Sequence, residues 1–328
     1  MLIWCLLSLF VRRSVLPLPS DSRDVRVDER NMDVGFWGNP TATIDFCEPN
    51  YEHSKYVAEF WNTLSSIPIF LVGAMGVWLC HVQALGPEQM LCYAMVAVVG
   101  LGSAAFHATL LREGQILDEC PMLWVVQVLI YTAYHHRSDR RQRCLAADRK
   151  EVRCSSRRQL VLLRTALILY AITATGVYFA SGFLFFVLAY AVSVAALVFL
   201  AAGILLSEQP RVGAQPRRLL TTAACTYVGG FGLLWIPGEV LCHRLPIMQR
   251  LPMHALFHLT SAAAPHLGLT AFALARFEVD AFAMHAGRVT DEPHASDSRP
   301  PLCARPSLMF AGLPTIDRQP WQLVRKAV

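Results

Sequence analysis

Charged side chains are scarce in this sequence. Asp, Glu, Lys and Arg make up 16% of its 328 residues, and hydrophobic residues make up 54%, whereas an ordinary soluble domain carries about 25% charged residues. One soluble core cannot bury that much apolar surface, so we expect a membrane protein. The sequence also lacks internal repeats, a glycine-rich phosphate loop and any nucleic-acid motif. We therefore expect no nucleic-acid partner and attribute the net charge of +5 to loops that face anionic lipid.

Seven apolar runs are long enough to cross a bilayer, which takes about 20 residues in a helix. Two of them, 90–111 and 182–206, contain no Asp, Glu, Lys or Arg at all. The pattern predicts an all-α protein, a bundle of seven transmembrane helices. The predicted spans are 60–79, 90–111, 117–134, 160–180, 182–206, 219–237 and 253–275.

Basic residues predict the orientation of the bundle. The connection 135–159 contains nine Lys and Arg residues, and a short loop that basic is retained on the cytosolic side. With seven spans, the N-terminus then lies in a lumen or outside the cell, and the C-terminus is cytosolic. The arginines between positions 12 and 30 suggest the opposite, but they lie too far from the first span to decide.

The chain divides into four predicted parts. Residues 1–34 form an extension that we expect to be disordered, and residues 35–59 form a lumenal segment. The helical domain spans 60–276. Residues 277–328 are rich in Pro, Ser, Asp, Arg and His without periodicity, which predicts a disordered cytosolic tail.

Two apolar stretches carry histidines at helical spacing. In "GLGSAAFHATLLREGQILDECP", Ser103 and His107 are four residues apart and share one helix face, and Asp118 begins the next span. In "MHALFHLT", His254 and His258 are also four residues apart, an arrangement that lets two imidazoles bind one metal ion.

The predicted topology brings these groups to one depth, toward the lumen. Three histidines with one open position are typical of a catalytic zinc site that activates water. The alternative is that each histidine only bonds a neighbouring helix. The other histidines are expected in loops, at span ends or, for His266, two turns deeper. We expect Glu119 to face away from Asp118 and to cap its helix.

Three segments resemble known proteins in order and spacing: "GFWGNPTATIDFCEPNYEHSKYVAEFWNTLSSIP", "GSAAFHATLLREGQILDECPM" and "HALFHLTSAAAPH". They resemble the signature segments of the alkaline ceramidases, seven-pass metal hydrolases of the superfamily that includes the adiponectin receptors. The resemblance covers about residues 35 to 275. It implies a zinc ion held by His107, His254 and His258, with Ser103 and Asp118 beside the water that attacks the substrate.

The resemblance also implies a calcium site in the segment before the first span. Its ligands would be Asp45, the backbone carbonyl of Phe46, Glu48, Asn50 and Glu59, an all-oxygen set of the kind that calcium prefers. Phe46 stands where the family usually has Trp. The alternative is a solvated acidic face that caps the first helix. We expect the calcium and zinc sites to be separable, so that loss of Glu59 would leave zinc bound.

Two of the ten cysteines, Cys47 and Cys242, are expected on the lumenal side, where oxidation is permitted. We call residues 45–59, which contain the proposed calcium ligands, the acidic segment. A disulfide between Cys47 and Cys242 would connect the acidic segment to the helix that carries His254. The alternative is that both are free thiols, and Cys120 is also expected near this face.

The resemblance implies a membrane enzyme of sphingolipid metabolism, in the endoplasmic reticulum or the Golgi. It would take ceramide from the bilayer and hydrolyse it to sphingosine and a free fatty acid, supported by calcium. Two alternatives stay open: a seven-pass metal-binding lipid receptor, and a GPI-remodelling lipid protein of the same superfamily. Neither the preferred acyl chain nor the sphingoid base follows from the sequence.

Overall fold

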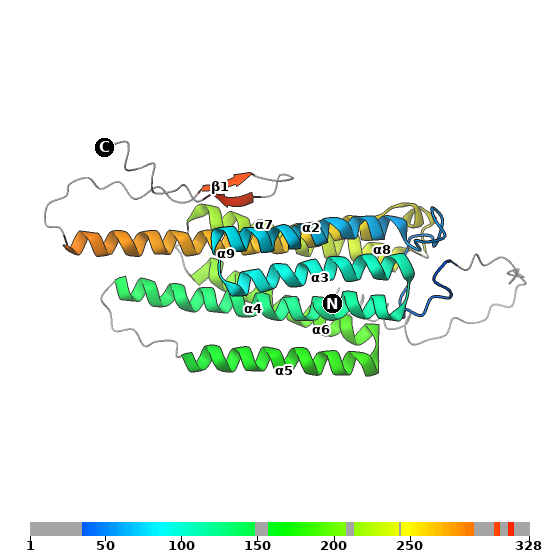
Figure 1. The fold of residues 1–328 in the computed structure, drawn as a ribbon, viewed down its shortest axis with the longest axis horizontal. Coiled ribbons are helices and arrows are strands. Elements are labelled where there is room, and N and C mark those ends of the chain that lie inside the picture. The colour runs from blue at the N-terminus through cyan, green and yellow to red at the C-terminus, as the bar shows by residue number, and fades with distance from the viewer. Residues whose placement is uncertain are drawn as a thin grey trace, which may run out of the picture.

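The computed structural model describes residues 35–147, 157–207, 213–242, 244–291, 305–308 and 314–317. Long helices run side by side in one bundle (Figure 1), which confirms the predicted all-α class. The helices are α2 (Phe60–Gln83), α3 (Pro87–Thr109), α4 (Arg112–Ala147), α5 (Arg157–Ser181), α6 (Phe183–Ser207), α7 (Ala214–Gly230), the π-helix η1 (Phe231–Trp235), α8 (Ile236–Leu241), the 3-10 helix η2 (Pro246–Arg250) and α9 (Met253–Asp291). Two short strands, β1 (Arg305–Leu308) and β2 (Pro314–Asp317), pair antiparallel near the C-terminus.

Six helical segments are long and apolar enough to cross a membrane, so the chain is a multi-pass membrane protein. They are Phe60–Gln83, Pro87–Thr109, Arg112–Ser138, Arg158–Ser181, Phe183–Leu206 and Ala214–Leu241. The last of these combines α7, η1 and α8, and η1 begins directly after Gly229 and Gly230. In the described part of the chain α9 falls outside this set, because His254, His258, His266 and Pro265 make its first half less apolar. The seventh span and the orientation stay predictions.

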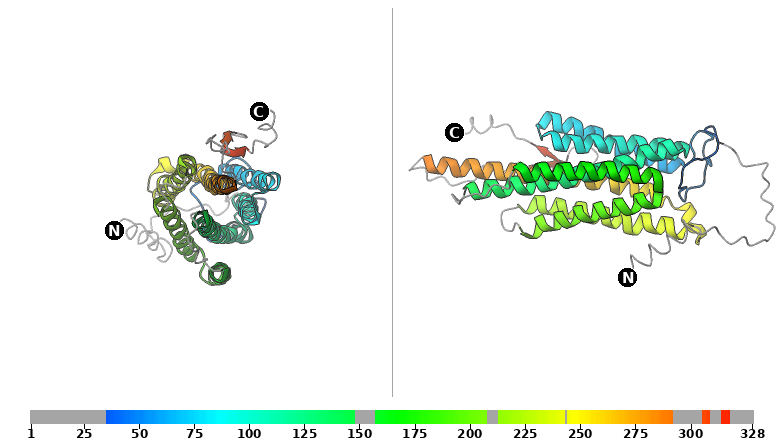
Figure 2. Two further views of the ribbon diagram at one scale, coloured as in Figure 1. Left: turned by 90° about the vertical axis from the view of Figure 1, so that its left-hand side faces the viewer. Right: turned by 90° about the horizontal axis from the view of Figure 1, so that it is seen from below.

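Close helix contacts at small residues hold the bundle together. A Cβ atom at Gly73 would lie 2.3 Å from the backbone nitrogen of Ala97, and one at Gly100 would lie 2.3 Å from that of Phe70. Helices α2 and α3 therefore approach until their backbones nearly touch, as small residues allow in membranes. By contrast α5 lies at the edge of the bundle in the end-on view (Figure 2).

Residues 35–59 fold against the end of the bundle where α3 stops (Figure 1, dark blue). The N–H groups of Thr41 and Ala42 donate to the carbonyl of Leu110, and that of Ala58 donates to Ala108. Leu110, in the left-handed conformation, ends α3. The segment before the first span is thereby attached to the helix end that carries His107.

The two ends of the chain were expected to be disordered. Residues 1–34 lie outside the described residues, as does most of 277–328. Within that second range the structure continues α9 as far as Asp291, past the helix end predicted at residue 276.

Candidate metal centre

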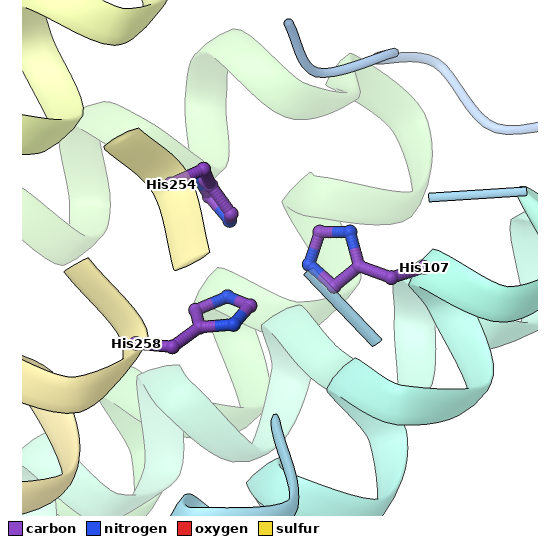
Figure 3. A group of neighbouring side chains, drawn as sticks. All are labelled: His107, His254 and His258. Carbon is purple, nitrogen blue, oxygen red and sulfur yellow. The ribbon is translucent and has the colours of Figure 1, made fainter. Parts of the chain in front are cut away.

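Three histidines from two helices converge at one point. His107 comes from the last turn of α3, and His254 and His258 come from the first two turns of α9. One ring nitrogen of each lies within 4.8 Å of those of the other two, and their ring centroids are 4.6 to 5.1 Å apart. The three rings face a common space (Figure 3). His107, His254 and His258, which the helix spacing and the predicted topology had brought to one depth, therefore lie together in the structure.

The hydrogen bonds of these rings leave nitrogens free toward the centre. Nδ1 of His107 contacts the Glu59 carboxylate, and Nδ1 of His258 lies 2.8 Å from the hydroxyl of Ser65. Among the described residues, Nε2 of His107 and Nδ1 of His254 are buried and have no hydrogen-bond partner. Buried nitrogens without partners are costly, and a metal ion would satisfy them. The cluster is therefore compatible with a metal site.

The partners of the rings come from the start of α2, and sequence reasoning missed most of them. Ser65 lies in the second turn of α2, and Glu59 immediately precedes that helix. Partners of this kind fix the tautomer and the orientation of a ligating histidine. Nothing in the sequence distinguishes Ser65 from a serine that merely bonds a neighbouring helix, so no local signal could have found it.

Ser103 is connected to the histidine cluster through one intervening side chain. Its buried hydroxyl lies 2.9 Å from that of Ser66, which in turn lies 3.5 Å from Nδ1 of His258. Ser66 also donates to the carbonyl of Asn62, at 2.8 Å. The chain of hydroxyls joins α2, α3 and α9 at one depth.

Asp118 reaches this depth because α3 and α4 touch at Gly102. A Cβ atom there would lie 2.1 Å from the carbonyl oxygen of Leu117 and 2.8 Å from the nitrogen of Asp118. The missing side chain lets the backbone of α4 press against α3 one residue before Ser103. Asp118 is buried at this contact, and none of the described residues donates a hydrogen bond to its carboxyl.

Glu119 does not cap its helix, so that interpretation was wrong. It lies seven residues inside α4, buried, and its Oε1 accepts a hydrogen bond of 2.8 Å from the amide of Gln115. The side-chain oxygen Oε1 of Gln115 accepts from the backbone N–H of Thr43, also at 2.8 Å. Glu119 therefore belongs to a polar network that attaches the 35–59 segment to α4.

Several of the predicted calcium ligands make hydrogen bonds within the acidic segment or to the start of α2. The amide of Asn50 donates to both carboxylate oxygens of Asp45, at 3.2 and 3.0 Å. Glu48 accepts the N–H groups of Trp61 and Asn62, at 2.6 and 2.9 Å. Glu48 therefore caps α2, as the alternative interpretation of this segment supposed.

Burial raises the pKa of the Glu48 carboxyl, because desolvation disfavours its charged form. The two N–H groups at the start of α2 oppose this rise in the pKa, and the neighbouring charge of Glu59 adds to it. Acids crowded in this way would be stabilised by a bound cation. The oxygen donors present therefore fit a hard cation such as calcium.

The acidic segment and the histidine cluster are in direct contact. Besides contacting His107, the Glu59 carboxylate accepts the N–H of Phe46 at 2.9 Å and the amide of Asn62 at 3.1 Å. The ring of Phe46 packs on His254, with 3.8 Å between centroids. The expectation that the two sites are separable therefore does not fit the structure, since Glu59 and Phe46 contact both.

Cys47 and Cys242 form a disulfide, with their Cα atoms 5.6 Å apart. The bond connects the acidic segment to the end of α8, shortly before α9 begins. Cys120 is buried and free. The acidic segment is thereby attached to α3 through hydrogen bonds and, through the disulfide, to the connection that leads into α9.

Comparison with known proteins places this chain in a family. A family model described as Ceramidase matches residues 38–285. The chain belongs to the Ceramidase family. The match covers all three histidines and the acidic segment, and it confirms the family to which the three signature segments pointed.

Curated relatives match over shorter stretches. Alkaline ceramidase 3 of Mus musculus is 38% identical over 100 residues, which cover 30% of this chain and 38% of that protein. An alkaline ceramidase of Arabidopsis thaliana is 36% identical over 107 residues, or 31% and 42% of the two chains. Alkaline ceramidase 1 of Homo sapiens is 38% identical over 88 residues, or 26% and 33%. The aligned stretches thus span about two fifths or less of these relatives of the Ceramidase family.

Proposed function

We propose that this protein is a zinc-dependent amidase that hydrolyses ceramide to sphingosine and a free fatty acid. The convergence of His107, His254 and His258, with buried ring nitrogens that lack partners, carries this proposal. Membership of the Ceramidase family supports the substrate. Three neutral imidazoles with one open position are the usual ligands of catalytic zinc.

Zinc, when bound, would polarise the amide carbonyl and make the attacking water more acidic. Asp118 takes a proton from that water as the water oxygen bonds to the carbonyl carbon of the substrate. It then gives the proton to the nitrogen as the C–N bond breaks. Ser103, whose hydroxyl lies 2.9 Å from that of Ser66, turns its hydroxyl hydrogen from Ser66 to the developing oxyanion and donates it there.

Calcium would support the reaction through the acidic segment. Asp45, the carbonyl of Phe46, Glu48, Asn50 and Glu59 are the proposed ligands. The crowding of Glu48 and Glu59 and the contact of Asn50 with Asp45 support this assignment. Because Glu59 also contacts His107, a cation at this segment would stabilise a partner of a zinc ligand.

The substrate would reach the site from the bilayer. Large apolar side chains are exposed along the membrane-capable helices, and ceramide is itself a membrane lipid. We place the site at the lumenal side of the endoplasmic reticulum or Golgi membrane, with the basic 135–159 connection in the cytosol.

Purified protein incubated with a panel of ceramides tests this proposal, with sphingoid bases and fatty acids measured by mass spectrometry. We expect both products in equal amounts, their loss with a zinc chelator and recovery on adding zinc. Asp118→Asn protein is the matched inactive control. Zinc-loaded protein that releases neither product from any ceramide would overturn the proposal and favour a metal-binding lipid receptor.

A further inference from the structure

A compact group of exposed aromatic side chains lies on the 35–59 segment. We call Phe36, Trp37 and Tyr56 the aromatic cap. The ring of Phe36 lies 5.0 Å from each of the other two, centroid to centroid. Their exposed fractions are 62%, 44% and 50%, large values for side chains of this kind.

Hydrogen bonds join the two parts of the aromatic cap. The indole N–H of Trp37 donates to the carbonyl of Tyr56 at 2.7 Å, and the N–H of Phe36 donates to that of Lys55 at 2.8 Å. The ammonium of Lys55 lies 5.2 Å from the centre of the Tyr56 ring, within cation–π range. Ordered rings that remain exposed on a fixed segment indicate an interaction surface.

The outer face of α2 indicates what that surface meets. Exposed apolar side chains recur at helical spacing along it, and they form a lipid-facing stripe that begins and ends near a tryptophan. Trp61 and Trp78 are 17 positions apart, or about 25 Å at helical rise, close to the roughly 30 Å of a hydrocarbon core. The residues of the stripe are Trp61, Leu64, Ile67, Leu71, Trp78 and Val82.

Tryptophan and tyrosine are enriched at the two membrane interfaces. Trp61 therefore marks the membrane boundary at the end of the bundle that holds the histidine cluster. The aromatic cap precedes Trp61 in the chain, on the segment that folds against this end (Figure 1). The aromatic cap therefore belongs to the same end of the bundle as Trp61.

We propose that the aromatic cap is an interfacial anchor that inserts among the lipid headgroups of the leaflet nearest the histidine cluster. The rings supply amphipathic surface, and Lys55 supplies a cation for lipid phosphates. The lipid-facing stripe begins five residues after Tyr56, and this closeness along the chain favours lipid over a protein partner. The inference depends on membrane insertion of α2, and it does not depend on the proposed reaction.

The anchor has a consequence that does rest on the proposed function. Tyr56 is three residues before Glu59, whose carboxylate contacts His107. Lipid bound at the cap would hold this segment in place beside the leaflet from which ceramide enters. Loss of the cap should therefore impair turnover of ceramide in bilayers more than turnover in detergent micelles.

Tryptophan fluorescence of the full chain in phosphatidylcholine vesicles tests the anchor directly. Subtracting the emission of Trp37→Phe protein from that of the unmodified protein isolates the Trp37 signal. We expect headgroup-spin-labelled lipid to quench this signal at least twofold more than acrylamide in the aqueous phase. Trp124, twelve residues inside α4, is the depth control, and its signal is isolated in the same way with Trp124→Phe protein. We expect lipid brominated on its acyl chains to quench the Trp124 signal more strongly than either headgroup-spin-labelled lipid or acrylamide does.

A Trp37 signal that acrylamide quenches freely, and that spin-labelled headgroups leave unchanged, would overturn the anchor. So would a Trp37 signal shielded from both quenchers, since that result means that protein, either this chain or a second copy of it, covers the ring instead of lipid. Because neither readout uses turnover, a protein that hydrolyses no ceramide could still carry the anchor. An active enzyme could equally lack it.

Discussion

The carboxylate of Glu59 is hydrogen-bonded to Nδ1 of His107, and both side chains are fully buried. The contact directs Nε2 of the same ring toward the other two histidines, where it has no partner among the described residues. A residue of the acidic segment thus orients a proposed zinc ligand.

Glu59→Ala should therefore weaken zinc binding as well as calcium support. Loss of a carboxylate behind a ligating histidine typically lowers metal affinity 10 to 100-fold, and the effect should be visible in a zinc titration with a competing chelator. Glu52→Ala is the matched control, because Glu52 is an exposed acid of the same segment. Unchanged zinc affinity in Glu59→Ala protein would mean that the contact with His107 does not orient the ligand.

His254→Ala and His258→Ala should each lose zinc and activity together, because two imidazoles cannot complete the ligand set. Metal content by mass spectrometry and ceramide turnover should fall in parallel. His81→Ala is the control, since His81 is exposed at the far end of α2. Full zinc occupancy in either variant would exclude that histidine as a ligand.

The histidine cluster could be predicted from the sequence because it depends mainly on residue spacing within single helices. Spacing of four places His254 and His258 on one helix face, and the count of spans brings His107 to the same end. What the sequence cannot predict depends on three-dimensional packing. Ser65 and Ser66 look like ordinary serines of a span, and only the structure shows which histidine they contact. His254, His258 and His266 also obscure the predicted seventh span, because they lower its hydropathy.

The bond between Cys47 and Cys242 should be present in active protein. Peptide mapping without reduction should recover the two cysteines in one linked pair, and an unlinked Cys47 peptide would contradict this. Cys47→Ser should lower the free energy of unfolding by about 2 to 5 kcal/mol. A thermal unfolding assay measures this loss. Cys225→Ser is the control in that assay, because Cys225 is free and exposed.

Gly102→Ala tests whether the contact of α3 with α4 positions Asp118. The new Cβ would lie 2.1 Å from the carbonyl of Leu117, so α4 must shift, and such overpacking costs about 1 to 3 kcal/mol. We expect a large loss of turnover with zinc retained. Gly176→Ala in α5 is the matched control, because nothing lies within 4 Å of its added Cβ. Equal activity of the two variants would show that the close contact is not needed.

Asp118→Asn separates proton transfer from metal binding. The amide keeps the shape of the carboxylate but cannot take a proton from water, so turnover should fall by about 10² to 10⁴, the usual contribution of a general base. Zinc should remain bound, since all three histidines are intact, and metal analysis of the same preparation checks this. Ser103→Ala should also keep zinc and should lose about 10²-fold or more, the contribution of one oxyanion donor. If Asp118→Asn protein with zinc bound hydrolyses ceramide at nearly the unmodified rate, Asp118 is not the base. Glu119, the adjacent buried carboxylate, would then be the next residue to replace.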